Sequence, residues 1–169
     1  MKYSFDFAAP LEYWPDLLAG AWTTLTLSLA ATFFGFLVGV FCALASTGKA
    51  KWLARLAGAY IEVIRNTPLL VQVFLVYFGM ASMGFKVGAF TAATVALVVN
   101  VGAYTSEIVR AGIESIPKSQ LEAAETLGLT RWQTLRHVVL PPAIERVFPA
   151  LTSQYVLLML ASSICSQIS

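Results

Sequence analysis

The sequence predicts an all-α membrane protein, a polytopic helical bundle, and two features of its composition indicate this. Of the 169 residues, 58% are hydrophobic and 12% are charged, against roughly 45–50% and about 25% in soluble domains. Asp, Glu, Lys and Arg are absent from four long runs: residues 17–48, 66–85, 87–106 and 147–169. Each run reaches the roughly 20 residues with which a helix covers a hydrocarbon layer. We therefore predict four membrane crossings within one transmembrane domain, residues 1–169, and exclude a soluble or disordered chain.

The positions of the basic residues predict the orientation. Nine of the eleven Lys and Arg residues lie in two segments, 49–65 and 110–146, and the other two are Lys2 and Lys86. Cytoplasmic segments of membrane proteins carry the excess of Lys and Arg. We therefore expect these two segments to be cytoplasmic and the N-terminus to face outside. After four crossings, residue 169 would also lie outside.

The first crossing is expected at about 18–45. A cleaved signal peptide ending at Ala43-Leu44-Ala45 is the weaker alternative, because the run is much longer than the roughly 7–15 residues of a signal core and follows an acidic segment. Small residues recur every four positions and share one helix face: Ala31, Gly35, Gly39 and Ala43. Such faces allow close helix packing in a bilayer. We favour packing within one bundle over a dedicated dimer seam.

The second crossing, about 66–82, follows an amphipathic helix expected at the membrane surface, which presents one apolar face: Leu53, Leu56, Tyr60, Ile61 and Ile64. Thr67 could cap a new helix with Pro68 as its first residue, or Pro68 could kink a continuous helix. Counted from Pro68 to Ser82, the helix would be about 22 Å long, which is short for a crossing. Broken helices at membrane depth line polar cavities, so Thr67 and Gln72 are candidate pathway residues, although a purely structural kink is the alternative.

The third crossing, about 87–109, carries polar residues on one side near its end: Asn100, Tyr104, Glu107 and Arg110. Polar groups at membrane depth are costly when they face lipid. We therefore expect Asn100 to face the bundle interior, and we count Asn100, Tyr104 and Glu107 among the pathway candidates. For Glu107 and Arg110, an ion pair at the cytoplasmic interface is the favoured interpretation.

Residues 116–142, before the fourth crossing at about 147–166, predict two short helices presented to the cytoplasm. Ser119 and Glu122 fit a capping box, and Gly128 can end the first helix in a left-handed conformation. Thr130 and Gln133 fit a second box, and Pro141-Pro142 would end the second helix. This helix–turn–helix suits contact with a soluble partner. DNA reading is disfavoured, because the pair would be held against the bilayer without a basic stripe.

The sequence offers few residues for catalysis or metal binding. His137 is the only histidine, and Cys42 and Cys165 lie in apolar runs. The sequence contains no G-x-x-x-x-G-K-[ST] motif, so we expect no P-loop ATP site in this chain. We therefore predict no catalytic residue, no metal and no cofactor held by the chain itself.

Several motifs carry a resemblance to a known family. The segment from Glu122 to Pro141 resembles the E-A-A-x3-G-x9-I-x-L-P loop of bacterial ABC importer permeases, with Val138 in place of Ile. Three upstream segments, Thr24–Ser28, Glu62–Leu70 and Gly102–Arg110, look like the polar amino acid branch that includes the histidine and glutamine systems. The chain has Asn66 where the family usually has Gly, which puts the backbone before Pro68 in question.

The resemblance implies an ATP-driven importer of a polar amino acid in the bacterial inner membrane. Two permease chains, identical or sister subunits, would form the pathway, two ATPase subunits would bind ATP and Mg²⁺, and a periplasmic binding protein would deliver the substrate. The residues implied in coupling to the ATPase are Glu122, Ala123, Ala124, Gly128, Leu140 and Pro141. The family commonly has a fifth membrane helix and a cytoplasmic C-terminus, so we expect either that the natural chain continues or that this is a truncated form. A membrane-anchored regulator or scaffold is the alternative function.

Overall fold

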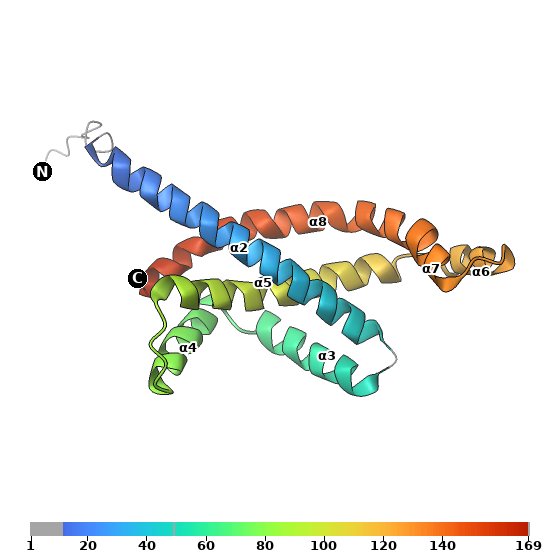
Figure 1. Cartoon of the computed structure of the whole chain (residues 1–169), viewed down its shortest axis with the longest axis horizontal. Helices are drawn as coiled ribbons and strands as arrows, with labels where there is room; N and C mark the ends of the chain where they lie inside the picture. Colours follow the sequence, from blue (N-terminus) through green and yellow to red (C-terminus); the bar gives the residue numbers. More distant parts are fainter. Residues whose placement is uncertain (1–11, 49, 169) are drawn as a thin grey trace, which may run out of the picture.

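A computed structural model describes residues 12–48 and 50–168, and within these ranges the regular structure is entirely helical. Figure 1 shows the helices as an elongated bundle. Their order is α2 (Trp14–Thr47), α3 (Lys51–Arg65), α4 (Leu69–Ser82), α5 (Ala89–Glu114), α6 (Lys118–Thr126), α7 (Arg131–Thr134), the π-helical η1 (Leu135–Val139), α8 (Leu140–Ala161) and the 3₁₀-helical η2 (Ser162–Ile168). The all-α prediction is confirmed for this part of the chain.

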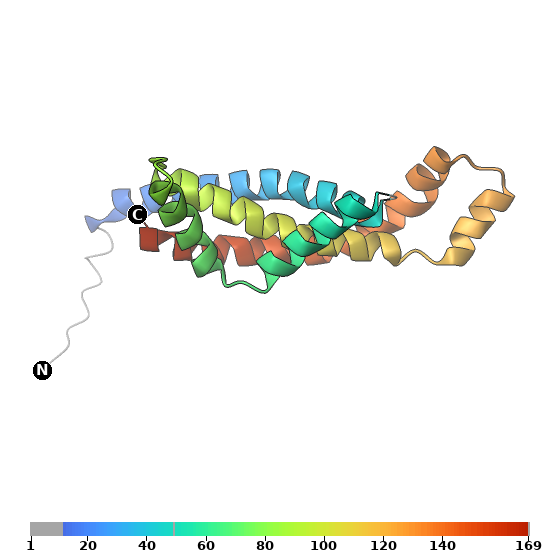
Figure 2. The same ribbon diagram turned by 90° about the horizontal axis from the view of Figure 1, so that it is seen from below.

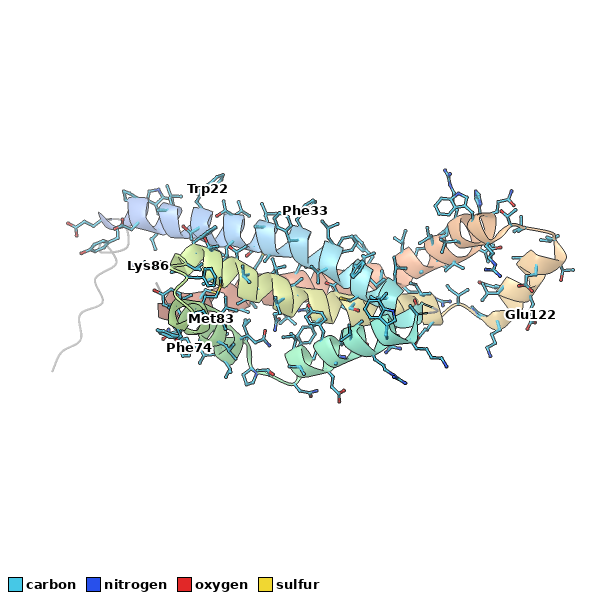
Figure 3. All side chains as sticks on the ribbon, turned by 60° about the horizontal axis from the view of Figure 1, so that its bottom comes forward. Trp22, Phe33, Phe74, Met83, Lys86 and Glu122 are labelled. Atoms are coloured by element: carbon cyan, nitrogen blue, oxygen red, sulfur yellow. The ribbon has the colours of Figure 1, made fainter. Side chains whose placement is uncertain are left out.

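The described helices are long and apolar enough for three or four membrane crossings. Three continuous stretches qualify: Trp14–Thr47, Ala89–Glu114 and Arg131–Ile168. The fourth would combine α3 and α4, which are bent by 107° relative to each other. Large apolar side chains such as Trp22, Phe33 and Phe74 are exposed on the outside of the bundle (Figure 3). An apolar outer surface is the one that lipid chains solvate.

The close packing of α2 on α5 explains the stripe of small residues. Ala31, Gly35, Gly39 and Ala43 are all buried. A Cβ atom on Gly39 would lie 2.6 Å from Cβ of Thr105, and one on Gly35 would lie 2.7 Å from Cγ1 of Val101. The predicted packing within one bundle is therefore confirmed, because this face is filled by α5 of the same chain.

The break between α3 and α4 differs in detail from both predicted forms. The second helix begins at Leu69, and Pro68 precedes it with extended backbone angles, φ −59° and ψ 138°. The Thr67 hydroxyl donates back to the Val63 carbonyl at 2.6 Å instead of capping α4. The predicted Thr67 cap was therefore wrong, and so was a kinked continuous helix. The interruption itself is confirmed, because two separate helices meet at a sharp angle.

The turn after α6 is formed as predicted, but the start of α6 is not. Gly128 has φ +71°, and the N–H groups of Gly128 and Leu129 donate to the carbonyls of Glu125 and Ala124. These two bonds form a Schellman motif. The predicted Ser119 cap was wrong, because α6 already begins at Lys118 after Pro117 and has no side-chain cap.

The second predicted helix does not end at Pro141-Pro142. Its capping box is confirmed, since the Gln133 N–H donates to Thr130 Oγ1 and Gln133 Oε1 accepts from the Thr130 N–H. The chain then passes through the π-helical turn η1 directly into α8. Proline is tolerated in the first turn of a helix, where its missing N–H costs little. The predicted stop was therefore wrong, and α7 is the beginning of the last long helical stretch.

The two ends of the bundle carry different connections. The α6–α7 hairpin projects at one end of the long axis, and the end of α2 and the beginning of α3 lie toward the same end (Figure 1, Figure 2). The α4–α5 connection and η2 lie at the opposite end. The beginning of α3 and the α6–α7 hairpin, which belong to the two segments rich in Lys and Arg, thus lie toward the same end of the bundle.

Candidate functional site

The buried Gln72 side chain joins the helix break to α5. Its Nε2 atom donates to the Ile64 carbonyl at 2.8 Å and to the Thr67 carbonyl at 2.9 Å. Its Oε1 atom accepts from Nδ2 of Asn100 at 3.1 Å. Gln72 is only 6% exposed, so all of its polar atoms are satisfied inside the protein. This side chain therefore links α4 to the end of α3, to the break and to Asn100 on α5.

A cavity of about 490 Å³ opens beside this break. The break supplies residues 65–69 to its wall, α5 supplies Asn100 and Tyr104, and α8 supplies Gln154 among apolar side chains. Gln72 lies behind the wall, with its amide turned to Asn100 and the break. Sequence reasoning missed Gln154. The signal was present, because it is the one amide side chain in the apolar part of α8.

A second cavity of about 430 Å³ lies further along α5. Glu62, Glu107 and Arg110 contribute charged groups to its lining. Arg65, Asn66 and Tyr104 line both cavities. The predicted pathway candidates are therefore brought together at the two cavities and the wall between them, although they come from residues 67 to 107 of the sequence.

Ion pairs organise the charged groups of the second cavity. Arg110 binds both carboxylate oxygens of Glu107 at 3.0 Å and also contacts Glu114 at 2.7 Å. The predicted Glu107–Arg110 pair is confirmed. A third partner was not predicted: Nη1 of Arg65 lies 3.2 Å from Oε2 of Glu107, with its guanidinium 5.4 Å from the Tyr104 ring centroid. Because these side chains are 27–53% exposed, each pair contributes about 0–1 kcal/mol.

The implied coupling residues form the projecting hairpin and its return to α8. Glu122 and Ala123 are exposed, whereas Ala124 is buried on the inner side of α6. Glu122 lies near the far tip of the molecule (Figure 3). Leu140 and Pro141 begin α8, behind a small apolar cluster of Ile116, Val139 and Ala143 with Ile113 and Leu121.

Arg146 forms hydrogen bonds with Ser115 at the base of the hairpin. Its Nη1 atom donates to the Ser115 carbonyl and to Ser115 Oγ, the latter at 2.7 Å. This contact joins the end of α5 to the beginning of α8. The described residues contain no group of three or more His, Cys, Asp or Glu side chains that could hold a metal ion.

The family comparison decides the identity. Residues 35–169 match the model of the binding-protein-dependent transport system inner membrane component. The chain belongs to this family. The permease is 38% identical to the L-cystine transport system permease protein TcyB of Bacillus subtilis over 93% of this chain and 67% of the relative. It is 40% identical to the glutamine transport system permease protein GlnP of Escherichia coli K12, over 90% of this chain and 71% of the relative.

Solved structures agree with this assignment. A crystal structure of an amino acid ABC transporter with histidines matches with a TM-score of 0.92 and 40% identity, covering 98% of the permease and 78% of that chain. The inward-facing MetNI methionine ABC transporter matches with a TM-score of 0.68 and 28% identity, over 88% of the permease and 72% of that chain. The permease is therefore a membrane component of the amino acid ABC importer family, and its helical bundle is the fold of that family.

Proposed function

We propose that the permease moves a polar amino acid across the inner membrane and that the first cavity lies on the path. One observation carries this proposal: polar groups from the helix break, α5 and α8 meet at a cavity in an otherwise apolar bundle. Polar residues at membrane depth mark substrate paths, and broken helices supply backbone groups to them. The cystine and glutamine systems named among the relatives support an amino acid as cargo.

The cavity offers groups for both parts of such a substrate. The hydrogen bonds of the first turn of α4 begin with Val71 and Gln72, whose N–H groups both donate to the Pro68 carbonyl. Leu69, which lines the cavity, is the first residue of α4, and its N–H group therefore lies at the positive end of the helix, where an anion is stabilised. Asn100 and Gln154 would bind a polar side chain, while Gln72 holds Asn100 in place.

The projecting hairpin is proposed as the contact with a separate ATPase. Exposed Glu122 and Ala123 would face this partner, and Ala124, Gly128, Leu140 and Pro141 would shape the contact. ATP and Mg²⁺ would bind to the ATPase, so the permease itself catalyses no reaction. A second permease chain, identical or a sister subunit, would complete the pathway, and a periplasmic binding protein would deliver the amino acid.

The proposed orientation places the hairpin in the cytoplasm and the N-terminus outside. Lys86 and Glu122 lie at opposite ends of the molecule (Figure 3). We expect Lys51→Cys and Arg131→Cys to react only with thiol reagents that have access to the cytoplasm, and Lys86→Cys to react from outside. The variants would be made in a background with Cys42 and Cys165 replaced. Cytoplasmic labelling at position 86 would contradict this orientation.

Uptake by a reconstituted complex tests the function. The permease would be purified with the ATPase and binding protein encoded beside it, placed in proteoliposomes, and given a radiolabelled mixture of the protein amino acids. We expect accumulation that requires both ATP and the binding protein. A complex that assembles but accumulates no amino acid would favour a regulator or scaffold instead.

A further inference from the structure

Arg65 holds a position shared by the two cavities. It is the last residue of α3, directly before the break. Its side chain lines the first cavity beside Asn100 and Thr67, and it lines the second beside Glu107. Among the described residues around the first cavity, Arg65 is the one that carries a charge. The wall between the cavities is therefore cationic on the side where a substrate would lie.

The contacts that hold Arg65 are weak. Among the described residues it makes one ion pair, 3.2 Å from one oxygen of Glu107, and its side chain is 41% exposed. Its guanidinium also lies 5.4 Å from the Tyr104 ring centroid. Exposed ion pairs and exposed cation–π contacts each stabilise a conformation only slightly. Another carboxylate that approaches from the first cavity can therefore compete for this guanidinium.

Glu107 does not depend on Arg65 for neutralisation. Both of its carboxylate oxygens accept hydrogen bonds from Arg110. Arg110 is held in turn by Glu114. If Arg65 moved away, Glu107 would keep its two charge-assisted hydrogen bonds, so the cost of an unpaired carboxylate would not arise. Glu107 on α5 is thus held in place by Arg110, whereas Arg65 on α3 can change its partner.

We propose that Arg65 exchanges the Glu107 carboxylate for the carboxylate of the amino acid that occupies the first cavity. This inference rests on the proposed function. Partner exchange would release the ion pair between the end of α3 and α5, beside the residues that line both cavities. Arg65 would then be a binding residue for the invariant part of every amino acid, while Asn100 and Gln154 contact the variable side chain.

If the exchange occurs, substitutions of Arg65 and of Glu107 should change the binding affinity in opposite directions. Binding would be measured on the purified permease–ATPase complex without the binding protein, with unlabelled protein amino acids titrated singly. Arg65→Met should weaken binding about tenfold or more, because a charge-assisted contact is lost. Glu107→Gln should tighten binding about two- to fivefold, because the competing carboxylate is gone.

Glu114→Gln is the matched control. Glu114 contacts Arg110 but neither Arg65 nor the cavities, so this substitution should leave the binding affinity unchanged. An ion pair with only a structural role would make Arg65→Met and Glu107→Gln weaken binding together, and that result would overturn the inference. A change in binding by Glu114→Gln equal to that of Glu107→Gln would also overturn it. If Arg65→Met fails to assemble, the sign of the Glu107→Gln shift decides alone.

Different results would refute the carboxylate exchange and the transport function. A wild-type complex that accumulates amino acids in proteoliposomes but shows no binding change in Glu107→Gln would refute the carboxylate exchange and leave the transport function standing. A wild-type complex that neither binds nor accumulates any amino acid would refute the function itself.

Discussion

Gly128→Val is expected to leave membrane insertion intact and to abolish most co-purification of the permease with its ATPase. Gly128 has φ +71°, and a Cβ atom there would meet no atom within 4 Å. The damage would therefore come from the backbone alone. A β-branched residue in the left-handed region raises the free energy of the folded turn by about 1–3 kcal/mol. The turn would relieve this strain by changing conformation, and it would then lose the Schellman hydrogen bonds to the carbonyls of Ala124 and Glu125. The measurement is the ATPase-to-permease ratio after affinity purification.

Gly84 provides a matched control for this variant. It has φ +86° and equally open surroundings, but it lies in the α4–α5 connection at the other end of the bundle. Gly84→Val should carry similar backbone strain and retain the ATPase. Gly128→Asn should also retain it, since Asn tolerates the left-handed region. Normal ATPase binding by Gly128→Val would argue against the hairpin as the contact.

The turn and the second capping box could be predicted because each depends on a few adjacent residues. Gly128 is needed where φ is positive, and Thr130 with Gln133 closes its hydrogen bonds within one turn. The stripe of small residues on α2 was predicted for the same kind of reason, as the four-residue spacing fixes one helix face. In such cases the local pattern and the final packing require the same conformation.

The errors occur where a local pattern depends on its distant surroundings. Pro141-Pro142 is typical of a helix end, but a preceding π-turn makes the pair part of a first helical turn. Thr67 was expected to cap α4, yet its hydroxyl finds a nearer acceptor in the last turn of α3. The same limit applies to the site: no spacing rule places Gln154 beside Asn100, or Arg65 between two cavities, since both depend on how α3, α5 and α8 pack.

Gln72 shows how a pathway candidate can acquire a different role. The sequence places it on the broken helix next to the cavity, but its three hydrogen bonds are all directed into the protein. Gln72→Leu would remove the hydrogen bonds to the Thr67 carbonyl, to the Ile64 carbonyl, which also accepts from the Thr67 N–H, and from Asn100, at about 0.5–1.5 kcal/mol for each hydrogen bond lost. Its main effect should be on folding. Asn100, on the cavity wall, provides the contrast.

Asn100→Leu is expected to reduce uptake strongly, or to change the preferred amino acid, in a complex that still binds its ATPase. Leucine keeps the branched shape of asparagine but has two methyl groups in place of the amide oxygen and nitrogen, so the cavity loses the amide that would bind a polar side chain. Loss of a hydrogen bond to a substrate typically costs about 0.5–1.5 kcal/mol, and more when the group that remains is buried and unpaired. That corresponds to roughly a twofold to more than tenfold loss of uptake per assembled complex.

The opposing interpretation is that Asn100 only bonds a neighbouring helix, an interaction that averages about 0.6 kcal/mol between membrane helices. It predicts lower thermal stability of the Asn100→Leu complex and unchanged uptake per assembled complex. The measurement is therefore uptake of each radiolabelled amino acid, normalised to the amount of intact permease–ATPase complex, together with the unfolding temperature. A normal uptake rate and unchanged preference would remove Asn100 from the pathway, because a residue that contacts the substrate must alter one of the two.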